Sequence, residues 1–199
     1  NHRGSSFGKH ATSQPSNIDF EHRLAIDLLR KQADGHAWFV LEDESRLIGR
    51  CALPLALYRG MQKFPMVWLE DSLANRIERI LRDYVSGLCA EYMALDAQDG
   101  FARYRTHLLL ALGNLVKRLG DERYRRLSGL MEAALDQQAV DGTVDSHRMW
   151  IEGLLREYYD PLYAYQREAK SFRLLFTGDQ AAVTGFLQQH HAAVIGSAN

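Results

Sequence analysis

The sequence lacks the features that mark membrane, zinc-binding and uniformly basic proteins. No apolar run reaches the roughly 18 residues that cross a bilayer, so we expect no membrane partner. The two cysteines, Cys51 and Cys89, have neither C-x-x-C nor zinc-site spacing, which favours a reducing, cytoplasmic location. The formal charge of −1 excludes a uniformly basic nucleic-acid binder and leaves only a local basic patch to be sought.

The composition that remains is that of a globular protein. The chain has 199 residues, of which 46% are hydrophobic and 25% charged, enough for a core that is stable without metal or disulfides. It begins Asn1-His2-Arg3-Gly4, with no initiator methionine, and we interpret it as part of a longer protein.

Short apolar runs alternate with amphipathic segments. The runs at residues 37–41 and 66–69 predict buried strands, and the run at 172–176 predicts a third strand. Helical periodicity predicts helices over residues 19–34, 54–63 and 72–159, a short tyrosine-rich helix after Asp160-Pro161, and a final helix after Gly178. This order predicts an α/β fold with a largely parallel sheet and a large α-helical insertion before the last strand.

Acidic residues directly follow the first predicted strand. Glu42 and Asp43 come after the apolar residues 37–41, as in the Walker-B segment of phosphate-binding α/β proteins. In that segment an acid at the carboxyl end of a strand orients a magnesium ion. Polar residues are also common where a strand ends and the chain leaves the core, and this explanation fits the sequence equally well.

Two further segments have side chains that suit an anion. Arg76 and Arg79 lie three residues apart on one helix face and could grip a phosphate, although a solvated face paired with Glu78 and Asp83 fits the pattern better. Residues 2–8 mix glycines, hydroxyls and a cation, a composition that can wrap an anion with backbone N–H groups. The P-loop motif G-x-x-x-x-G-K-[ST] occurs nowhere in the sequence.

Charge is divided unevenly within the helical block. Residues 101–130 hold seven cationic side chains against two acids, and residues 131–160 reverse that ratio. A basic helical face flanked by aromatic rings can hold an RNA backbone, whereas pairing of the basic half with the acidic half is the alternative that the pattern alone favours. The candidate RNA-binding side chains are Arg103, Arg105, Lys117, Arg118, Arg123, Arg125 and Arg126, with Tyr159 and Tyr163 of a tyrosine-dense segment that could stack on a base.

Five segments together resemble the C-terminal part of the bacterial tRNA 2-selenouridine synthase family. They are HRGSSFG (2–8), VLEDESRLIG (40–49), VWLEDSLANRIERI (67–80), KRLGDERYRRL (117–127) and VDSHRMWIEGLLREYYDPLYAYQ (144–166). They occur in the family's order and span nearly the whole chain. The strings EDESR and YYDPxYxYQ are far more specific than the general motifs above.

The resemblance implies an enzyme that replaces the sulfur of wobble 2-thiouridine in tRNA with selenium. Selenophosphate is the selenium donor, and a geranylated intermediate is made from geranyl diphosphate. Family members join a rhodanese domain, which carries a catalytic cysteine, to a P-loop domain. Both the rhodanese and the P-loop are missing from this sequence, so we assign no catalytic residue here and expect no turnover from this chain alone.

The resemblance also divides the chain and assigns supporting roles. We expect a partial P-loop NTPase-like α/β domain at residues 1–82, a helical block that holds the tRNA anticodon arm at 83–168, and a returning strand and helix at 169–199. Three groups of residues are expected at the phosphate site. Arg3, Ser5 and Ser6 would close over a diphosphate, and Glu42 or Asp43 would position a cation, with Asp43 as the candidate magnesium ligand. Arg46, Arg76 and Arg79 would offset the negative charge that builds up on the leaving group.

Two other classes of protein fit parts of the pattern. A fragment of a P-loop small-molecule kinase would explain the acids after the strands and the pair Arg76 and Arg79, but not the basic helices or the tyrosines. A non-catalytic helical interaction module would bind protein and no phosphate. Steep salt dependence of tRNA binding would separate the synthase from both.

Overall fold

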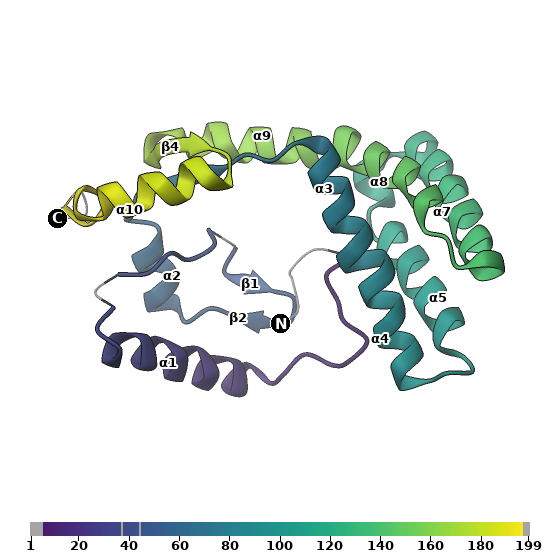
Figure 1. Cartoon of the computed structure of the whole chain (residues 1–199), viewed down its shortest axis with the longest axis horizontal. Helices are drawn as coiled ribbons and strands as arrows, with labels where there is room; N and C mark the ends of the chain where they lie inside the picture. Colours follow the sequence, from purple (N-terminus) through teal and green to yellow (C-terminus); the bar gives the residue numbers. More distant parts are fainter. Residues whose placement is uncertain (1–5, 37, 44, 197–199) are drawn as a thin grey trace. The chain divides into compact units, whose positions relative to one another are not determined.

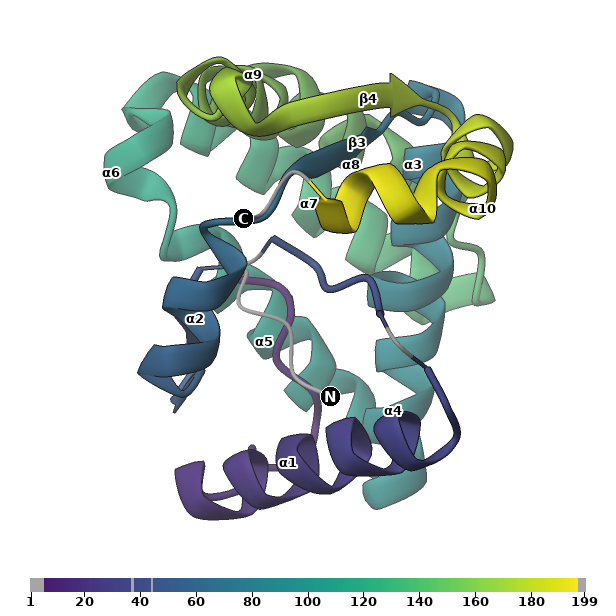
Figure 2. The same ribbon diagram turned by 90° about the vertical axis from the view of Figure 1, so that its left-hand side faces the viewer.

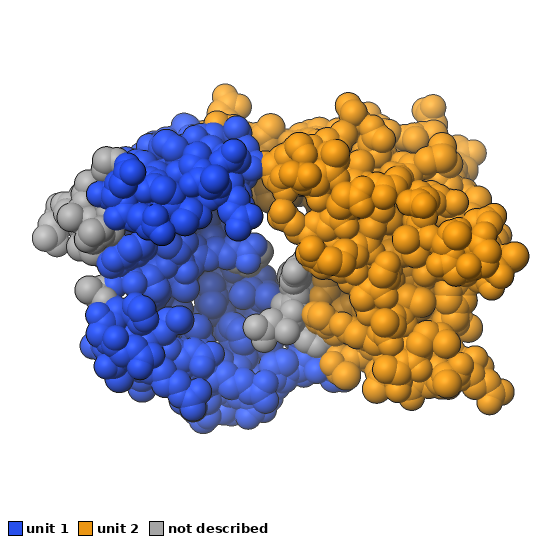
Figure 3. Space-filling view, viewed as in Figure 1, with its two compact units in different colours: residues 1–4, 13–70, 170–199 blue, residues 5–12, 71–169 orange. Residues whose placement is uncertain are grey.

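The computed structural model of the chain describes residues 6–36, 38–43 and 45–196, with side chains described as far as residue 189. It divides into two compact units, which Figure 3 colours separately. Unit 1 comprises residues 1–4, 13–70 and 170–199, and unit 2 comprises residues 5–12 and 71–169. Most of unit 2 is therefore a single insertion between the two long segments of unit 1.

Unit 1 contains a short parallel sheet. Its elements are α1 (Asn17–Ala33), β1 (Leu47–Ile48), β2 (Cys51–Ala52), α2 (Leu55–Met61), β3 (Met66–Leu69), η4 (Ser171–Arg173), β4 (Leu174–Gly178) and α10 (Gln180–Gly196). Strand β3 pairs in parallel with β4, with Val67 opposite Phe176, and Figure 2 shows the two strands side by side. The parallel pairing and the helical insertion before the last strand are both confirmed.

The predicted first strand is wrong. Residues 38–41 form no regular structure, and Phe39, Val40 and Leu41 are 42%, 57% and 38% exposed. An apolar run becomes a strand only when a neighbouring strand pairs with it, and among the described residues β3 pairs with β4 alone.

The other two predicted strands form with corrections. Strand β3 has the predicted bounds, yet Leu69 is 51% exposed, so only its first residue, Met66, is buried. The last strand lies two residues later than predicted, because a 3₁₀ turn takes up Phe172.

Unit 2 is entirely helical in its regular elements. These are α3 (Leu73–Ile80), η1 (Leu81–Gly87), α4 (Leu88–Leu95), α5 (Gly100–Gly113), α6 (Val116–Leu119), α7 (Asp121–Asp141), η2 (Asp145–His147), α8 (Arg148–Leu154), η3 (Leu155–Tyr159) and α9 (Asp160–Ala169). Figure 1 shows how α3, α4, α5, α7 and α8 run beside one another. The Ser72 hydroxyl accepts the Asn75 backbone N–H at 3.1 Å, as expected of a helix N-cap. No described helix is both long and apolar enough to span a membrane.

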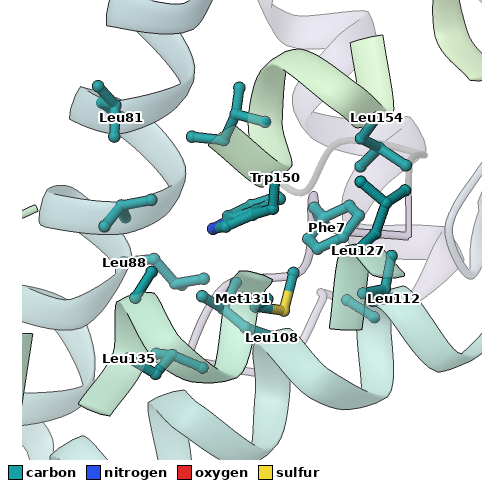
Figure 4. Close-up of a cluster of buried hydrophobic side chains, with 14 of the residues drawn as sticks. Phe7, Leu81, Leu88, Leu108, Leu112, Leu127, Met131, Leu135, Trp150 and Leu154 are labelled. Atoms are coloured by element: carbon teal, nitrogen blue, oxygen red, sulfur yellow. The ribbon is translucent and has the colours of Figure 1, made fainter. Parts of the chain in front are cut away.

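The core of unit 2 is a single cluster of buried side chains, shown in Figure 4. Leu108, Leu127, Met131 and Leu135 are each wholly buried there. The segment before the first helix also contributes, because the Phe7 ring stacks on Trp150 with its centroid 5.8 Å away. Burial of this many apolar side chains is the main source of the unit's stability.

One polar network lies inside this core. The Trp150 indole N–H donates to His147 Nδ1 at 2.9 Å, and His147 Nε2 lies 3.0 Å from the Gln138 amide oxygen. An indole nitrogen can only donate, so the imidazole is neutral, accepts at Nδ1 and carries its proton on Nε2. Burial lowers the pKa of His147 to about 4, in agreement with this assignment.

Two long helices of unit 2 each contain a π-helical turn. Segment η1 separates α3 from α4, and η3 separates α8 from α9. The helix expected to end near Tyr159 therefore continues through Asp160-Pro161. Pro161 has no N–H for an i→i−4 bond, and the π turn directly before α9 is where the chain leaves the regular α-helical hydrogen-bond register.

Candidate nucleic-acid interface

Asp43 of unit 1 is held by two cations. Lys170 Nζ donates to one carboxylate oxygen at 2.6 Å and Arg173 to the other at 3.3 Å. Burial by itself would raise the pKa of Asp43, but the hydrogen bonds and charges of Lys170 and Arg173 outweigh it and lower the pKa. Arg173 also donates to the backbone oxygens of Met61 and Phe64, each at 3.0 Å, and so ties η4 to α2 and the turn that follows it.

The other phosphate-site candidates of unit 1 lie near the surface. Glu42 and Arg46 are exposed, and the Arg46 Nε donates to the Leu53 backbone oxygen at 3.4 Å. Within the described parts of the chain, no group of three or more His, Cys, Asp or Glu side chains is placed to hold a metal ion. The magnesium role of Asp43 stays a prediction.

The two arginines predicted to grip a phosphate belong to unit 2, where each has a carboxylate partner. Arg76 forms a bidentate pair with Asp160, at 2.5 and 3.0 Å, and Arg79 lies 2.6 Å from Asp71. The hydrogen bond to Asp160 raises the pKa of Arg76. The Arg76–Asp160 pair joins α3 to the first residue of α9, whereas the sequence alternative had assigned Glu78 and Asp83 as partners.

The opening segment is only partly described. Arg3 and Ser5 lie outside the described residues. The Ser6 hydroxyl donates to the Ala111 backbone oxygen at 2.6 Å and so fastens this segment to α5. A phosphate role for Ser6 would require that bond to open.

Several candidate RNA-binding arginines are paired with acids of the second half of the helical block. Arg105 lies 2.6 Å from Asp136, and Arg123 and Arg126 share Glu157, with Arg123 at 3.7 Å. Arg103 has a longer ion pair with Asp96, at 3.9 Å. For Arg105, Arg123 and Arg126 the pairing alternative describes the structure, whereas the partner of Arg103 lies outside the acidic half. Pairs of this kind at the surface contribute little to stability.

Three other cations of the block differ from these arginines in their partners. Among the described residues, Lys117, Arg118 and Arg125 form no ion pair with a carboxylate. Arg125 donates to the Asp121 backbone oxygen at 3.3 Å, and Arg118 donates to the Tyr158 hydroxyl at 3.0 Å. All three are exposed on α6 and the start of α7, so their positive charges are available to an external anion.

Arg118 connects these cations to a group of tyrosines. The rings of Tyr158 and Tyr159 meet edge to face with centroids 4.8 Å apart, and Tyr163 stacks on Tyr159 at 6.4 Å. Burial and the neighbouring tyrosines raise the pKa of Tyr159, so its hydroxyl stays protonated at any physiological pH. Tyr163 is 51% exposed and offers a ring face to solvent. We call Lys117, Arg118, Arg125, Tyr158, Tyr159 and Tyr163 the basic–aromatic surface.

Sequence reasoning missed the features that shape this surface. The π turn η3 directly precedes α9, and Glu157 within it neutralises Arg123 and Arg126 but not Arg125. These partners are 31 and 34 residues apart along the chain, so no local spacing rule identifies them. The signal that the sequence did give was the density of tyrosines beside Asp160-Pro161.

The family comparison covers almost the whole chain. The model of the tRNA 2-selenouridine synthase AAA domain matches residues 1–194. Curated tRNA 2-selenouridine synthases match with 62% identity in Pseudomonas fluorescens Pf-5, over 95% of this chain and 52% of the relative, and with 60% identity in Azotobacter vinelandii, over 98% and 53%. The protein of that name from Bordetella bronchiseptica is 60% identical over 94% of this chain and 51% of its own.

The chain spans about half the length of the curated relatives it matches. No solved structure matches it. The match to the AAA domain agrees with an α/β fold of the P-loop NTPase type that carries a large helical insertion. The chain belongs to the tRNA 2-selenouridine synthase family.

Proposed function

We propose that this chain is the part of a tRNA 2-selenouridine synthase that holds the tRNA. The complete enzyme would replace the sulfur of wobble 2-thiouridine with selenium from selenophosphate, through a geranylated intermediate made from geranyl diphosphate. Family membership supports the reaction class. The P-loop and the rhodanese cysteine would then come from other parts of the protein, and the site of action would be the cytoplasm.

The observation that carries the proposal is the basic–aromatic surface of unit 2. Its cations Lys117, Arg118 and Arg125 are exposed and lack a carboxylate partner among the described residues, so binding a phosphate costs them no ion pair. The exposed ring of Tyr163 belongs to the same surface, because it stacks on Tyr159, whose ring contacts that of Tyr158. Phosphate contacts supply affinity for an RNA backbone, and an aromatic face accepts an unstacked base.

This arrangement suits the anticodon arm of a tRNA. Bases of a single-stranded loop can be splayed out, whereas those of a duplex are stacked on their neighbours. In the proposal the three cations hold backbone phosphates of the arm, and Tyr159 and Tyr163 receive the wobble uridine or the prenyl chain attached to its sulfur. The paired arginines Arg105, Arg123 and Arg126 then contribute less to binding than the three free cations, because each must first leave its acid.

The phosphate-handling residues remain a separate part of the proposal. Arg3, Ser5, Ser6, Glu42, Arg46, Arg76 and Arg79 are proposed to bind or neutralise the phosphates of selenophosphate or geranyl diphosphate. Asp43 fits a magnesium ligand poorly as it lies here, because each of its oxygens already accepts a hydrogen bond from a cation.

Filter binding of 2-thiouridine tRNA across salt concentrations tests the proposal. Each phosphate contact contributes about 0.7 to 0.9 to the log–log salt slope, so three contacts give a slope of roughly 2 or more between about 50 and 200 mM salt. Arg118→Ala and Arg125→Ala should each reduce the magnitude of the slope by about 0.7 to 0.9, the contribution of one phosphate contact.

The matched control is Arg156→Ala. Arg156 is exposed in the same unit and carries the same charge, but it pairs with Glu152 at 2.9 Å and lies outside the basic–aromatic surface. Its removal should leave the slope unchanged. A flat salt response of the unsubstituted chain, or equal losses in Arg118→Ala and Arg156→Ala, would reject the proposed tRNA-holding role.

A further inference from the structure

A pocket of unit 2 lies on helices other than those of the basic–aromatic surface. It is formed by α4 and α5 and has a volume of about 420 Å³. Its lining residues are Tyr92, Ala102, Arg103, Thr106, His107 and Leu110. This volume lies at the small end of the range for ligand pockets.

Close packing of α4 and α5 builds this pocket. The positions 103, 106, 107 and 110 share one face of α5, and Tyr92 reaches them from α4. A Cβ at Gly100 would lie 2.6 Å from the Tyr92 backbone oxygen, so only glycine lets α5 begin directly against α4. This approach brings the Tyr92 hydroxyl to 3.1 Å from His107 Nδ1.

Arg103 is held in place yet weakly neutralised. Its guanidinium lies over the Tyr92 ring, 5.8 Å from the centroid, which restricts the side chain before any ligand binds. Asp96 is 3.9 Å away through one oxygen, while its other oxygen accepts the backbone N–H groups of Gln98 and Asp99. A phosphate could therefore replace Asp96 at Arg103 without leaving that carboxylate unsatisfied.

His107 and Arg103 both line the pocket. Its Nε2 is buried and has no hydrogen-bond partner among the described residues. Burial, and to a smaller extent the positive charge of Lys9, lower the pKa of His107, which favours the neutral imidazole. Leu110, which is 65% exposed, forms an apolar wall of the same pocket.

We propose that this pocket binds a single nucleotide of the RNA, with its phosphate on Arg103 and its base or ribose against Leu110 and Ala102. The His107 ring forms part of the pocket wall, so its proton signals respond to an occupant of the pocket. This inference rests on the proposed tRNA-holding function, because the ligand is a second part of the same RNA.

The test compares salt slopes for tRNA binding by Arg103→Ala and by Arg82→Ala. Arg82 is an exposed arginine of the same unit that pairs with the adjacent Asp83 at 2.8 Å, outside the pocket. Arg103→Ala should lower the slope by about 0.7 to 0.9 and weaken binding several-fold at low salt, whereas Arg82→Ala should change neither. Far-UV circular dichroism establishes that both variants remain helical.

A second arm distinguishes RNA from a free nucleotide as the ligand. Uridine 5′-monophosphate and tRNA are titrated separately while the imidazole proton signals of His107 are followed by NMR, with Tyr92→Phe as the variant that alters the pocket without removing charge. The proposal predicts that tRNA moves the His107 signals and that Tyr92→Phe reduces this shift.

The outcomes separate this inference from the function on which it rests. Normal salt-dependent tRNA binding with equal slopes for Arg103→Ala and Arg82→Ala would overturn the pocket alone. His107 signals that respond to the mononucleotide but not to tRNA would overturn RNA as the ligand. No salt-dependent tRNA binding by the unsubstituted chain would overturn both proposals.

Discussion

Units 1 and 2 differ in how many of their apolar side chains are buried. Nearly all the buried apolar residues of the described chain belong to the single core of unit 2, whereas those of unit 1 are Cys51, Leu53, Met66 and Val183. Helix α1 of unit 1 forms with a sound N-cap and yet buries no residue, and its Ile18 and Leu29 are 66% and 63% exposed. Apolar periodicity therefore predicts that a helix forms, but not what its apolar face packs against.

The largest effect on stability is expected from a substitution of Trp150, in the core of unit 2. This side chain is 2% exposed in the core of unit 2, and its indole also donates to His147. Trp150→Ala should lower the free energy of unfolding by about 3 to 5 kcal/mol, through the lost burial and the cavity that remains. Urea unfolding followed by far-UV circular dichroism measures it.

The control for Trp150 is an aromatic residue of unit 1. Phe172 is 83% exposed, so Phe172→Ala should change the free energy of unfolding by less than about 0.5 kcal/mol. Comparable losses in the two variants would contradict the difference between the units.

The pH dependence of unfolding distinguishes the contribution of buried His147 to the stability of unit 2 from that of its apolar side chains. The pKa of His147 is about 4 in the folded protein, below its ordinary value of 6.5, so the unfolded chain binds the proton more tightly. The contribution of neutral His147 to the free energy of unfolding is fully present above pH 6.5. It is lost as the pH falls from there toward 4, by up to about 3 kcal/mol.

The measurement is the free energy of unfolding of the unsubstituted chain and of His147→Gln at several pH values. The glutamine variant cannot titrate in this range, so the difference between the two chains should shrink as the pH falls. A difference that stays constant between pH 7 and pH 4 would show that His147 does not carry the lowered pKa.

A smaller effect is expected for the polar anchor of unit 1. Arg173→Met keeps an apolar stem but removes the hydrogen bonds to Met61, Phe64 and Asp43. The free energy of unfolding should fall by about 1 to 3 kcal/mol, because two backbone oxygens lose a charged donor and Asp43 loses one of its two cations. Trp68 fluorescence during urea unfolding reports it, since Trp68 lies on β3 of the same unit.

The exposed Arg59 on α2 provides the control for Arg173. Arg59→Met should leave the Trp68 transition within about 0.5 kcal/mol of the unsubstituted chain. If Arg173→Met behaves in the same way, the hydrogen bonds around Asp43 do not hold unit 1 together.

Local patterns predicted the elements well where helix periodicity or a cap decides the structure. The helix that begins after Ser72 and the strand at residues 66–69 are confirmed. The strand at 37–41 failed because pairing depends on a neighbour that periodicity does not reveal. Phe7 was missed as a core residue because a lone aromatic among glycines and serines has no period.

The candidate site was predictable in composition but not in pairing. The sequence identified the cations of α6 and α7 and the tyrosines, because residue types are local. It could not tell Arg125, which has no carboxylate partner in the described part of the chain, from Arg126, which pairs with Glu157, because Glu157 lies 31 residues further along the chain, in η3.

The salt dependence of tRNA binding by the triple variant Lys117→Ala/Arg118→Ala/Arg125→Ala is the most direct test of the tRNA-holding role. Loss of three phosphate contacts should lower the log–log slope by roughly 2 relative to the unsubstituted chain. The helical circular dichroism signal should persist, because these side chains are exposed. A slope that stays unchanged in the triple variant would contradict the account.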